Sequence, residues 1–202
     1  MKRKYTIEVS LVDPQDTAIQ DALWKLLVLI DHEFIPPLSV RESTTEMTLT
    51  GNERNATTGP RAYFSKILKQ SIIMAQAEGN WAGFLTFRHN ETLAFLGEQN
   101  PCNYLTTIGV SPYFRNIGVA RSMYRFALTD LPIGLQAPYW ATRTWSTNSD
   151  HIHLLDKIGF TLAAKLKDHR GEGIDTHYYA YEMPERFIAP IKIIKPLSVG
   201  QA

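Results

Sequence analysis

A chain of 202 residues is long enough to bury one good hydrophobic core, so a single domain is the expected organisation. Hydrophobic residues make up 44% and charged residues 20%, as in ordinary soluble globular proteins. A net charge of +1 gives no reason to expect nucleic acid or an anionic membrane as the main partner. The single cysteine, Cys102, excludes an intramolecular disulfide and a zinc site built from cysteines.

No targeting or membrane segment is expected. The basic start, Met1–Lys4, is not followed by the apolar core of a signal peptide. The longest apolar stretch, around Leu26–Ile30, is too short to span a bilayer. The cytoplasm is therefore the expected compartment, and no membrane partner is expected.

The first half of the chain is predicted to alternate strands and helices. Apolar residues at i, i+3 and i+4 spacing indicate an amphipathic helix over Asp16–Phe34. The segment Ile35–Gly59 has no such period and is rich in Thr, Ser, Asn and Glu, so a long irregular loop is expected there, either functional or disordered. The other elements predicted here are a strand at Tyr5–Leu11, a short helix at Pro60–Gln70 and a hairpin of strands at Ile72–Ala77 and Trp81–Arg88.

The second half continues the alternation. Its predicted elements are a strand at Tyr104–Val110, a helix at Asn116–Leu128, a strand at Tyr139–Trp145, a helix at Ser149–Ile158 and strands at Phe160–Leu166 and Thr176–Met183. No repeat or change of composition marks a second domain, so we expect one domain over residues 1–183 and an extension without helical period over residues 184–202. The order β-α-α-β-β-β-α-β-α-β-β predicts an α/β (α+β) fold in which helices pack on the faces of a mixed sheet.

The segment Thr107–Arg121 joins the fourth predicted strand to the third predicted helix and has the features of an anion site. The first N–H groups of a helix have no intrahelical partner, and the helix dipole favours negative charge there. Gly118 and Ala120 lack bulk, so a phosphate can approach the backbone, while Arg115 and Arg121 bracket the turn with positive charge. Neither a Walker-type loop nor a dinucleotide fingerprint is present.

This turn resembles the signature of the GNAT superfamily, the acyl-CoA-dependent N-acetyltransferases. The family pattern is Arg/Gln-x-x-Gly-x-Gly/Ala after a strand that ends in Val-x-Pro. Arg115, Gly118 and Ala120 fill the three defined positions, and Val110–Ser111–Pro112 precedes them. The specificity of the resemblance comes from the flanking strand and helix and from a second block downstream.

The second block, Asn148–Phe160, resembles the family segment Asn-x-x-Ala-x-x-Leu-Tyr-x-Lys-x-Gly-Phe. The positions that match are Asn148, Leu154, Lys157, Gly159 and Phe160. His151 replaces the usual Ala, and Leu155 replaces the usual Tyr. The residue chemistry agrees with a helix here, because Asn148 or Ser149 can cap its start and the glycine can end it.

The resemblance implies a mixed, mostly antiparallel central sheet of about seven strands with helices on both faces. It also implies transfer of an acetyl group from acetyl-CoA to a primary amine of a small molecule or protein, without a metal. Family members hold the acyl carbonyl and the pantetheine arm with N–H groups late in the strand before the turn, here those of Ile108 and Val110. The residues that the resemblance assigns to acetyl-CoA binding are Ile108, Val110, Arg115, Asn116, Gly118, Val119, Ala120, Arg121 and Asn148.

The groups that transfer protons are not identified by the sequence. Leu155 cannot donate a proton where relatives often have a tyrosine, and Thr106 and Thr107 stand where many relatives have a glutamate base. Histidine titrates near neutrality, so His151 or His153 could move a proton, although both are also ordinary residues of a helix surface. The catalytic residues therefore stay unknown, and the candidates are His151, Glu98 and Tyr178, with Glu33 as a second nearby carboxylate.

The acceptor is also left open. In this family the segment after the first helix borders the acceptor cleft, and carboxylates in Ile35–Gly59 would suit a cationic amine, whereas a solvated loop is the alternative. Trp81, Trp140 and Trp145 are expected in the core, and nothing resembles an RNA-binding strip. An amine acceptor is the expected partner, and the sequence leaves open whether the chain forms a homodimer. The alternative function is a non-catalytic acyl-CoA-binding or interaction module that lost its acid and base.

Overall fold

The computed structural model describes residues 5–41, 59–97 and 100–184. The strands are β1 (Ile7–Val12), β2 (Ser71–Ala77), β3 (Asn80–Glu91), β4 (Cys102–Val110), β5 (Tyr139–Trp145), β6 (Thr161–Leu166) and β7 (Thr176–Glu182). The helices of more than one turn are α1 (Thr17–Ile30), α2 (Arg61–Ile67), α3 (Val119–Thr129) and α4 (Ser149–Ile158). Their order along the chain is the predicted one.

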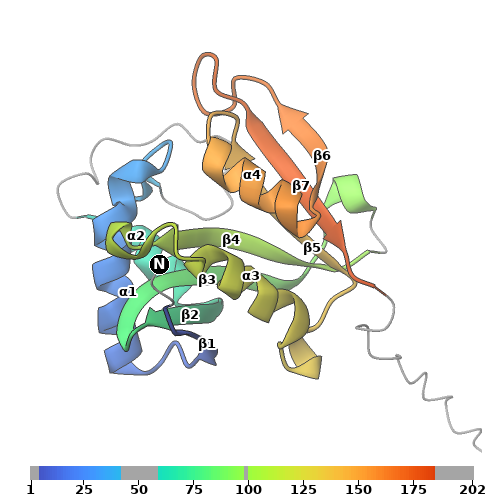
Figure 1. Cartoon of the computed structure of the whole chain (residues 1–202). Coiled ribbons are helices and arrows are strands. Elements are labelled where there is room, and N and C mark those ends of the chain that lie inside the picture. Colours follow the sequence, from blue (N-terminus) through green and yellow to red (C-terminus); the bar gives the residue numbers. More distant parts are fainter. Residues whose placement is uncertain (1–4, 42–58, 98–99, 185–202) are drawn as a thin grey trace, which may run out of the picture.

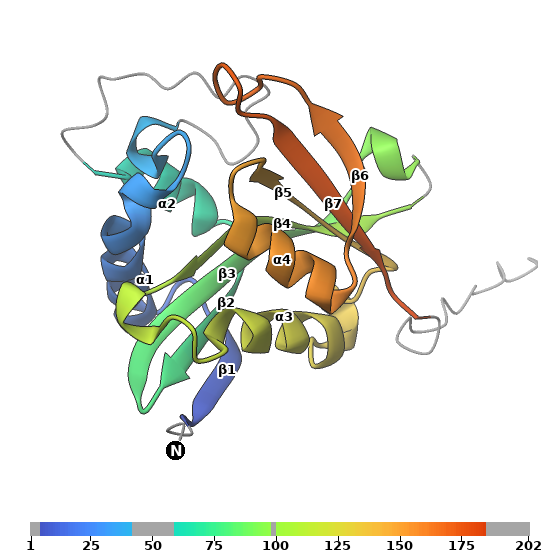
Figure 2. The ribbon, with the colours of Figure 1, turned by 45° about the horizontal axis from the view of Figure 1, so that its top comes forward.

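The strands form one sheet in the order β1-β2-β3-β4-β5-β7-β6 (Figure 1). All neighbours are antiparallel except β4 and β5, which run parallel. Helices α1 and α2 cover one face, and α3 and α4 cover the other (Figure 2). The prediction of a mixed, mostly antiparallel sheet with helices on both faces is confirmed.

The two faces of the sheet carry separate cores, because successive residues of a strand point to opposite sides. Ile72 and Ile73 in β2 are both fully buried. Ile72 packs in the cluster that contains Leu27 of α1, and Ile73 packs in the cluster that contains Met123 of α3. A strand with helices on both faces reads as a nearly continuous apolar run, as β2 does.

Three predicted helices have different bounds in the structure, and one of them, predicted over Pro60–Gln70, spans Arg61–Ile67. The first helix ends at Ile30, and a 3-10 turn over Asp31–Glu33 follows it. The third begins at Val119 rather than Asn116, because Asn116 (φ 61°) and Gly118 (φ 100°) have the left-handed backbone that a right-handed helix cannot contain.

The beginning of the predicted Ile35–Gly59 loop is built into the core. Leu38–Val40 forms a 3-10 helix, and Leu38 is fully buried in the cluster under α1 and α2. The Asp31 carboxylate accepts the Ser39 N–H at 2.7 Å and fixes this turn. The expectation of a wholly irregular segment is therefore wrong for Leu38–Val40, because three residues are too few to show a helical period. Residues 42–58 lie outside the described residues.

Strand β4 contains a β-bulge near its middle. Thr107 pairs with Thr86 of β3 and Leu105 pairs with Phe87, so that Thr106 has no partner residue in β3. The Thr106 hydroxyl lies 2.8 Å from the Thr86 hydroxyl and 2.5 Å from Gln70 Oε1. A bulge bends its strand and increases the local twist, and it therefore sets the direction of the second half of β4.

The second half of β4 also lies very close to α1. A Cβ atom added to Gly109 would stand 2.1 Å from Ile30 Cδ1 and 3.0 Å from the Phe84 ring. The glycine therefore leaves room for the end of the Ile30 side chain where α1 approaches β4. None of the helices in the described part of the chain has the length and apolar character that crossing a membrane requires.

The contact of α1 with β4 predicts a cost for Gly109→Ala. We expect the free energy of unfolding to fall by about 1–3 kcal/mol, because overpacking displaces Ile30 and Phe84. The control is Gly134→Ala, since a Cβ atom at Gly134 meets nothing within 4 Å. Urea titration of the three proteins is the measurement. Equal stability of Gly109→Ala and Gly134→Ala would contradict the close packing.

Candidate functional site

The pairing of β4 with β5 stops at the bulge. Cys102–Leu105 pairs with Tyr139–Thr142, and no residue beyond Leu105 in β4 has a partner in β5. The two parallel strands therefore separate over their second halves, and the edge of β4 that would face β5 is open. A cavity of about 600 Å³, a typical size for a ligand site, lies at this opening.

The backbone N–H groups of Ile108 and Val110 face the opening. Ser111 N–H donates to the Ala82 carbonyl of β3 at 2.8 Å. Because amides alternate in direction along a strand, those of Gly109 and Thr107 also face β3, and those of Val110 and Ile108 face the opposite edge. The Val110 carbonyl, on that same edge, accepts hydrogen bonds from Arg115 Nε and Nη2 at 3.3 Å.

The start of α3 borders the same cavity. Ser122 N–H makes the first helical hydrogen bond, to the Gly118 carbonyl at 2.9 Å, so the N–H groups of the three residues before it have no partner within the helix. Those three residues are Val119, Ala120 and Arg121, and all of them line the cavity. The positive φ of Gly118 sets the direction in which α3 begins. The start of the helix is a suitable place for a phosphate.

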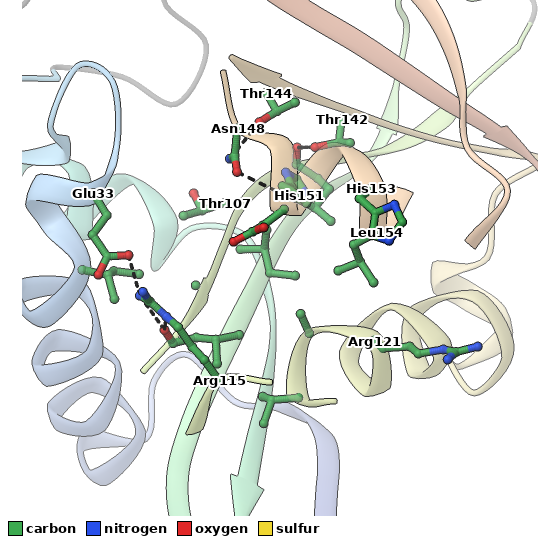
Figure 3. A pocket seen from close by; sticks show the side chains of 18 of the residues that line it. Glu33, Thr107, Arg115, Arg121, Thr142, Thr144, Asn148, His151, His153 and Leu154 are labelled. Atoms are coloured by element: carbon green, nitrogen blue, oxygen red, sulfur yellow. Dashed lines mark hydrogen bonds and ion pairs between the residues drawn. The ribbon is translucent and has the colours of Figure 1, made fainter. Parts of the chain in front are cut away.

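The arginines at this turn differ in their placement. Arg115 forms an ion pair with Glu33 at 2.5 Å and joins the end of α1 to the end of β4. Figure 3 shows Arg121 lying along α3 and directed away from Arg115. Of these two arginines, Arg115 is therefore the one that lies at the opening of the cavity beside the end of α1.

Asn148 closes the cavity from the α4 side. Its Oδ1 accepts the His151 N–H at 3.3 Å, and its Nδ2 donates to the Thr144 hydroxyl at 3.1 Å (Figure 3). The asparagine thus caps α4 and ties it to the end of β5. The structure brings all nine residues of the predicted cofactor set to the lining of one cavity.

His151 lines the cavity and makes a hydrogen bond inside the wall. Its Nε2 lies 2.8 Å from the Tyr124 hydroxyl of α3. Burial lowers the pKa of His151 to about 4 and raises the pKa of Tyr124. Both groups are therefore neutral near pH 7, and the imidazole carries no proton that it could readily give up there.

The other candidates lie in different places. Tyr178 is in β7, where its hydroxyl accepts a hydrogen bond from Arg143 Nη1 at 3.4 Å and its ring packs on Phe95 at 5.2 Å. His153 also lines the cavity, although its side chain is exposed on α4. Glu98 lies outside the described residues. Leu155 is fully buried between α4 and the sheet.

Sequence reasoning missed two features, one beside the cavity and one in its wall. The Tyr63 hydroxyl of α2 lies 2.7 Å from the Thr107 hydroxyl, and both side chains are almost fully buried. Arg143 and Trp145 line the cavity from β5, although Trp145 was expected in the core. Arg143 is the only charged residue of Tyr139–Trp145, and a lone charge in such a strand was the available signal.

Metal ligands are not grouped at this site. Within residues 5–41, 59–97 and 100–184, no cluster of three His, Cys, Asp or Glu side chains has the geometry to hold a metal ion. The polar side chains that line the cavity are hydroxyls, amides, arginines and the ionisable groups of Glu33, Asp150, His151, His153 and Lys157.

The Acetyltransferase (GNAT) family model matches residues 39–160 of the chain. The fold is similar to an N-acetyltransferase from Staphylococcus aureus Mu50 (15% identity, 89% of this chain, 99% of that chain, TM-score 0.58). It is also similar to the ribosomal-protein-S18-alanine N-acetyltransferase of Escherichia coli (12% identity, 94% of this chain, 100% of that chain, TM-score 0.57). A third similar structure is the acetyltransferase of Salmonella typhimurium that modifies the N-terminal serine of ribosomal protein L7/L12 (14% identity, 89% of this chain, 96% of that chain, TM-score 0.60).

At such identities the likeness to these structures shows the shared fold alone. No curated protein sequence matches the chain.

The buried state of His151 predicts a pH dependence of stability. The unfolded chain takes up a proton at this residue near pH 6.5, whereas the folded protein does so only near pH 4. The contribution of the neutral ring to the free energy of unfolding is therefore fully present above pH 6.5 and is lost as the pH falls towards 4. The variant His151→Gln keeps a hydrogen-bonding group. We expect its free energy of unfolding to change less steeply with pH over this range, by a slope that corresponds to about one proton.

Urea unfolding between pH 4 and pH 6.5 measures the two slopes. His153→Gln is the control, since its side chain is exposed on the same helix, and its slope should equal that of the wild type. Identical slopes for His151→Gln and the wild type would show that the folded protein binds the proton at His151 as readily as the unfolded chain does.

Proposed function

The chain belongs to the acetyltransferase (GNAT) family, and from this premise we propose that it transfers the acetyl group of acetyl-CoA to the primary amine of a small molecule or a protein. Membership of the family confirms the interpretation as an acetyltransferase. The observation that carries the proposal is the separation of β4 from β5 beyond Leu105, since it places unpaired N–H groups in the wall of a ligand-sized cavity.

The start of α3 is the proposed site of the CoA pyrophosphate. The N–H groups of Val119, Ala120 and Arg121 are available to phosphate oxygens, and the positive end of the helix dipole adds to the attraction. Gly118 and Ala120 leave room for the phosphates. Arg115 adds positive charge at the mouth of the cavity, although it also neutralises Glu33.

The N–H groups of Ile108 and Val110 are the proposed donors to the acyl carbonyl and the pantetheine arm. Donors fixed by a sheet need no reorganisation during the reaction, so they stabilise negative charge that develops on the acyl oxygen. When bound, acetyl-CoA supplies a thioester and a thiolate leaving group of low basicity. The chain's own contribution is therefore mainly orientation of the two reactants and stabilisation of charge.

The proposed proton path uses no dedicated acid on α4. Leu155 has no proton to donate, and His151 is neutral and bonded to Tyr124. Thr107 lines the cavity, and its hydroxyl, 2.7 Å from that of Tyr63, is the proposed contact for a water molecule or the incoming amine. A small neutral fraction of the amine is then sufficient for attack.

The proposal also covers the range of acceptors, the bounds of the domain and the cellular compartment. The Escherichia coli and Salmonella typhimurium structures are enzymes that act on ribosomal proteins, so protein amines remain in the range beside small molecules. We place the acetyltransferase domain over residues 1–183 and the extension over residues 184–202. The cytoplasm is the proposed compartment, and no nucleic-acid or membrane partner is proposed.

The pyrophosphate site predicts that Ala120→Glu blocks the binding of CoA. The new carboxylate would stand among the N–H groups meant for phosphate, and we expect affinity for CoA to fall by about 100-fold or more. The helix itself should be preserved, because an acidic residue in the first turn is favourable. Calorimetric titration with CoA measures the affinity, and thermal unfolding checks the fold.

Ser122→Glu is the matched control, since it adds the same charge to the first turn of α3 but Ser122 does not line the cavity. Its affinity for CoA should stay within about threefold of the wild type, a free-energy change under ~1 kcal/mol. Tight binding of CoA by Ala120→Glu would place the pyrophosphate elsewhere.

A further inference from the structure

Three side chains connect the two halves of the sheet across the opening between β4 and β5. Trp145 is the last residue of β5, Phe34 follows the 3-10 turn at the end of α1, and Arg170 lies in the loop between β6 and β7. The rings of Phe34 and Trp145 contact each other, with 5.8 Å between their centroids, and both line the cavity. We refer to these three residues as the aromatic bridge.

The aromatic bridge lies on the α1–α2 side of the sheet. Trp140 packs in the cluster that contains Met123 of α3, and Trp145, five residues further along β5, points to the opposite face. Phe34 packs against the cluster that contains Leu27 of α1. The bridge therefore lies on the other side of the opening from the start of α3, where the proposed pyrophosphate site is.

Phe34 stands beside the end of β4. Its neighbour Glu33 forms an ion pair with Arg115, whose guanidinium also donates to the Val110 carbonyl at 3.3 Å. Phe34 therefore comes from the side of the last residue of β4, and Trp145 is the last residue of β5. The contact between the two rings closes this end of the opening on the α1–α2 side.

Arg170 connects the two sides of the bridge. Its guanidinium lies over the Trp145 ring, 5.6 Å from the centroid, and its Nη1 donates to the Ile35 carbonyl at 2.6 Å. Its Nε donates to the hydroxyl of Thr176, the residue of β7 that pairs with Trp145. Arg170 is 9% exposed, so the loss of one of these contacts would leave a polar group away from water. These contacts hold the Trp145 ring in place across the opening.

The bridge shortens the approach to the proposed acyl site. From Thr107, whose hydroxyl lies 2.7 Å from that of Tyr63, to Val110 the strand advances by about 10 Å. The bridge closes the Val110 end of this length, so an acceptor from the α1–α2 side reaches the Ile108 amide through a gap of less than about 10 Å. Carbon atoms in contact are already about 4 Å apart. An extended alkyl chain therefore fits this gap better than a branched carbon or a ring.

We propose that the aromatic bridge determines the specificity for the acceptor and selects an amino group at the end of an unbranched chain, such as a lysine side chain or a straight-chain alkylamine. An amino group on a branched carbon, such as the α-amine of an amino acid or of a protein N-terminus, carries substituents that would collide with the rings of Phe34 and Trp145. The inference rests on the proposed acetyl transfer and narrows its class of acceptor.

Matched pairs of amines test this preference in a thiol-release assay with acetyl-CoA. The pairs are n-butylamine with sec-butylamine, n-hexylamine with cyclohexylamine, and lysine amide acetylated at its α-amine with lysine amide acetylated at its side chain. A peptide with one lysine and an acetylated N-terminus is compared with a lysine-free peptide that has a free N-terminus. We expect kcat/KM of the unbranched member to exceed that of its partner by about tenfold or more. In the lysine pair the α-amine has the lower pKa and thus the larger neutral fraction, which works against the expected result.

Variants of the bridge then test its role in this preference. In Trp145→Ala the preference for the unbranched member should fall below about threefold, mainly through a lower KM for the branched amines. Trp145→Phe keeps a ring and should retain the preference of the wild type. Arg170→Gln loosens the Trp145 ring and should give an intermediate preference. Affinity for CoA should stay within about threefold in all three variants, because the bridge and the start of α3 lie on opposite sides of the opening.

Trp24→Ala is the matched control. Trp24 makes the same kind of contact away from the cavity, since its ring centroid lies 5.3 Å from that of Phe64 and 5.2 Å from the guanidinium of Arg61. This variant should lose stability without a change of preference. Thermal unfolding checks the fold of every variant, and if Trp145→Ala does not fold, Arg170→Gln and the wild-type panel decide the question.

The outcomes separate this inference from the function on which it rests. Equal kcat/KM within the pairs, or a wild-type preference in both Trp145→Ala and Arg170→Gln, would overturn selection by the bridge and leave acetyl transfer intact. An equal change of preference in Trp24→Ala would overturn it as well, since the effect would then be one of general stability. A wild-type chain that binds CoA and acetylates none of these amines or peptides would refute the proposed transfer itself.

Discussion

The bulge at Thr106 is the feature on which the rest of the site depends. By inserting one residue opposite Thr86 and Phe87, it turns β4 away from β5 at the point where their pairing ends. The hydrogen bonds of the Thr106 hydroxyl satisfy the extra residue inside the sheet. A regular β4 would continue its ladder with β5, and the amides that now face the cavity would be consumed in that ladder.

The opening joins two sides of the sheet that are otherwise sealed from each other by separate cores. The α3–α4 side presents a helix start, which is a suitable place for phosphates, and the α1–α2 side presents the hydroxyl pair of Tyr63 and Thr107. The amides of β4 lie between the two sides. Two reactants can therefore reach these amides from opposite sides of the sheet.

Local patterns in the sequence predicted local structure well. The bounds of Tyr139–Trp145 and Ser149–Ile158 are confirmed, because turn and cap residues mark both ends of each. All nine expected cofactor residues line one cavity, because they lie in two short segments. The pair of Tyr63 and Thr107, 44 residues apart, was not predictable, since no local pattern reports which strand residue a helix will face.

The face of α4 that lines the cavity differs from the face that packs inward. Burial keeps His151 and Tyr124 uncharged, and Leu155 is fully buried, whereas Asp150, His153 and Lys157 line the cavity. Backbone amides stabilise an acyl oxygen whatever the amine is. Selection between acceptors therefore depends on the side chains that line the cavity, such as Asp150 of α4 and Trp145 of β5. A change of acceptor during evolution would be achieved through these side chains, while the bulge and the start of α3 stay as they are.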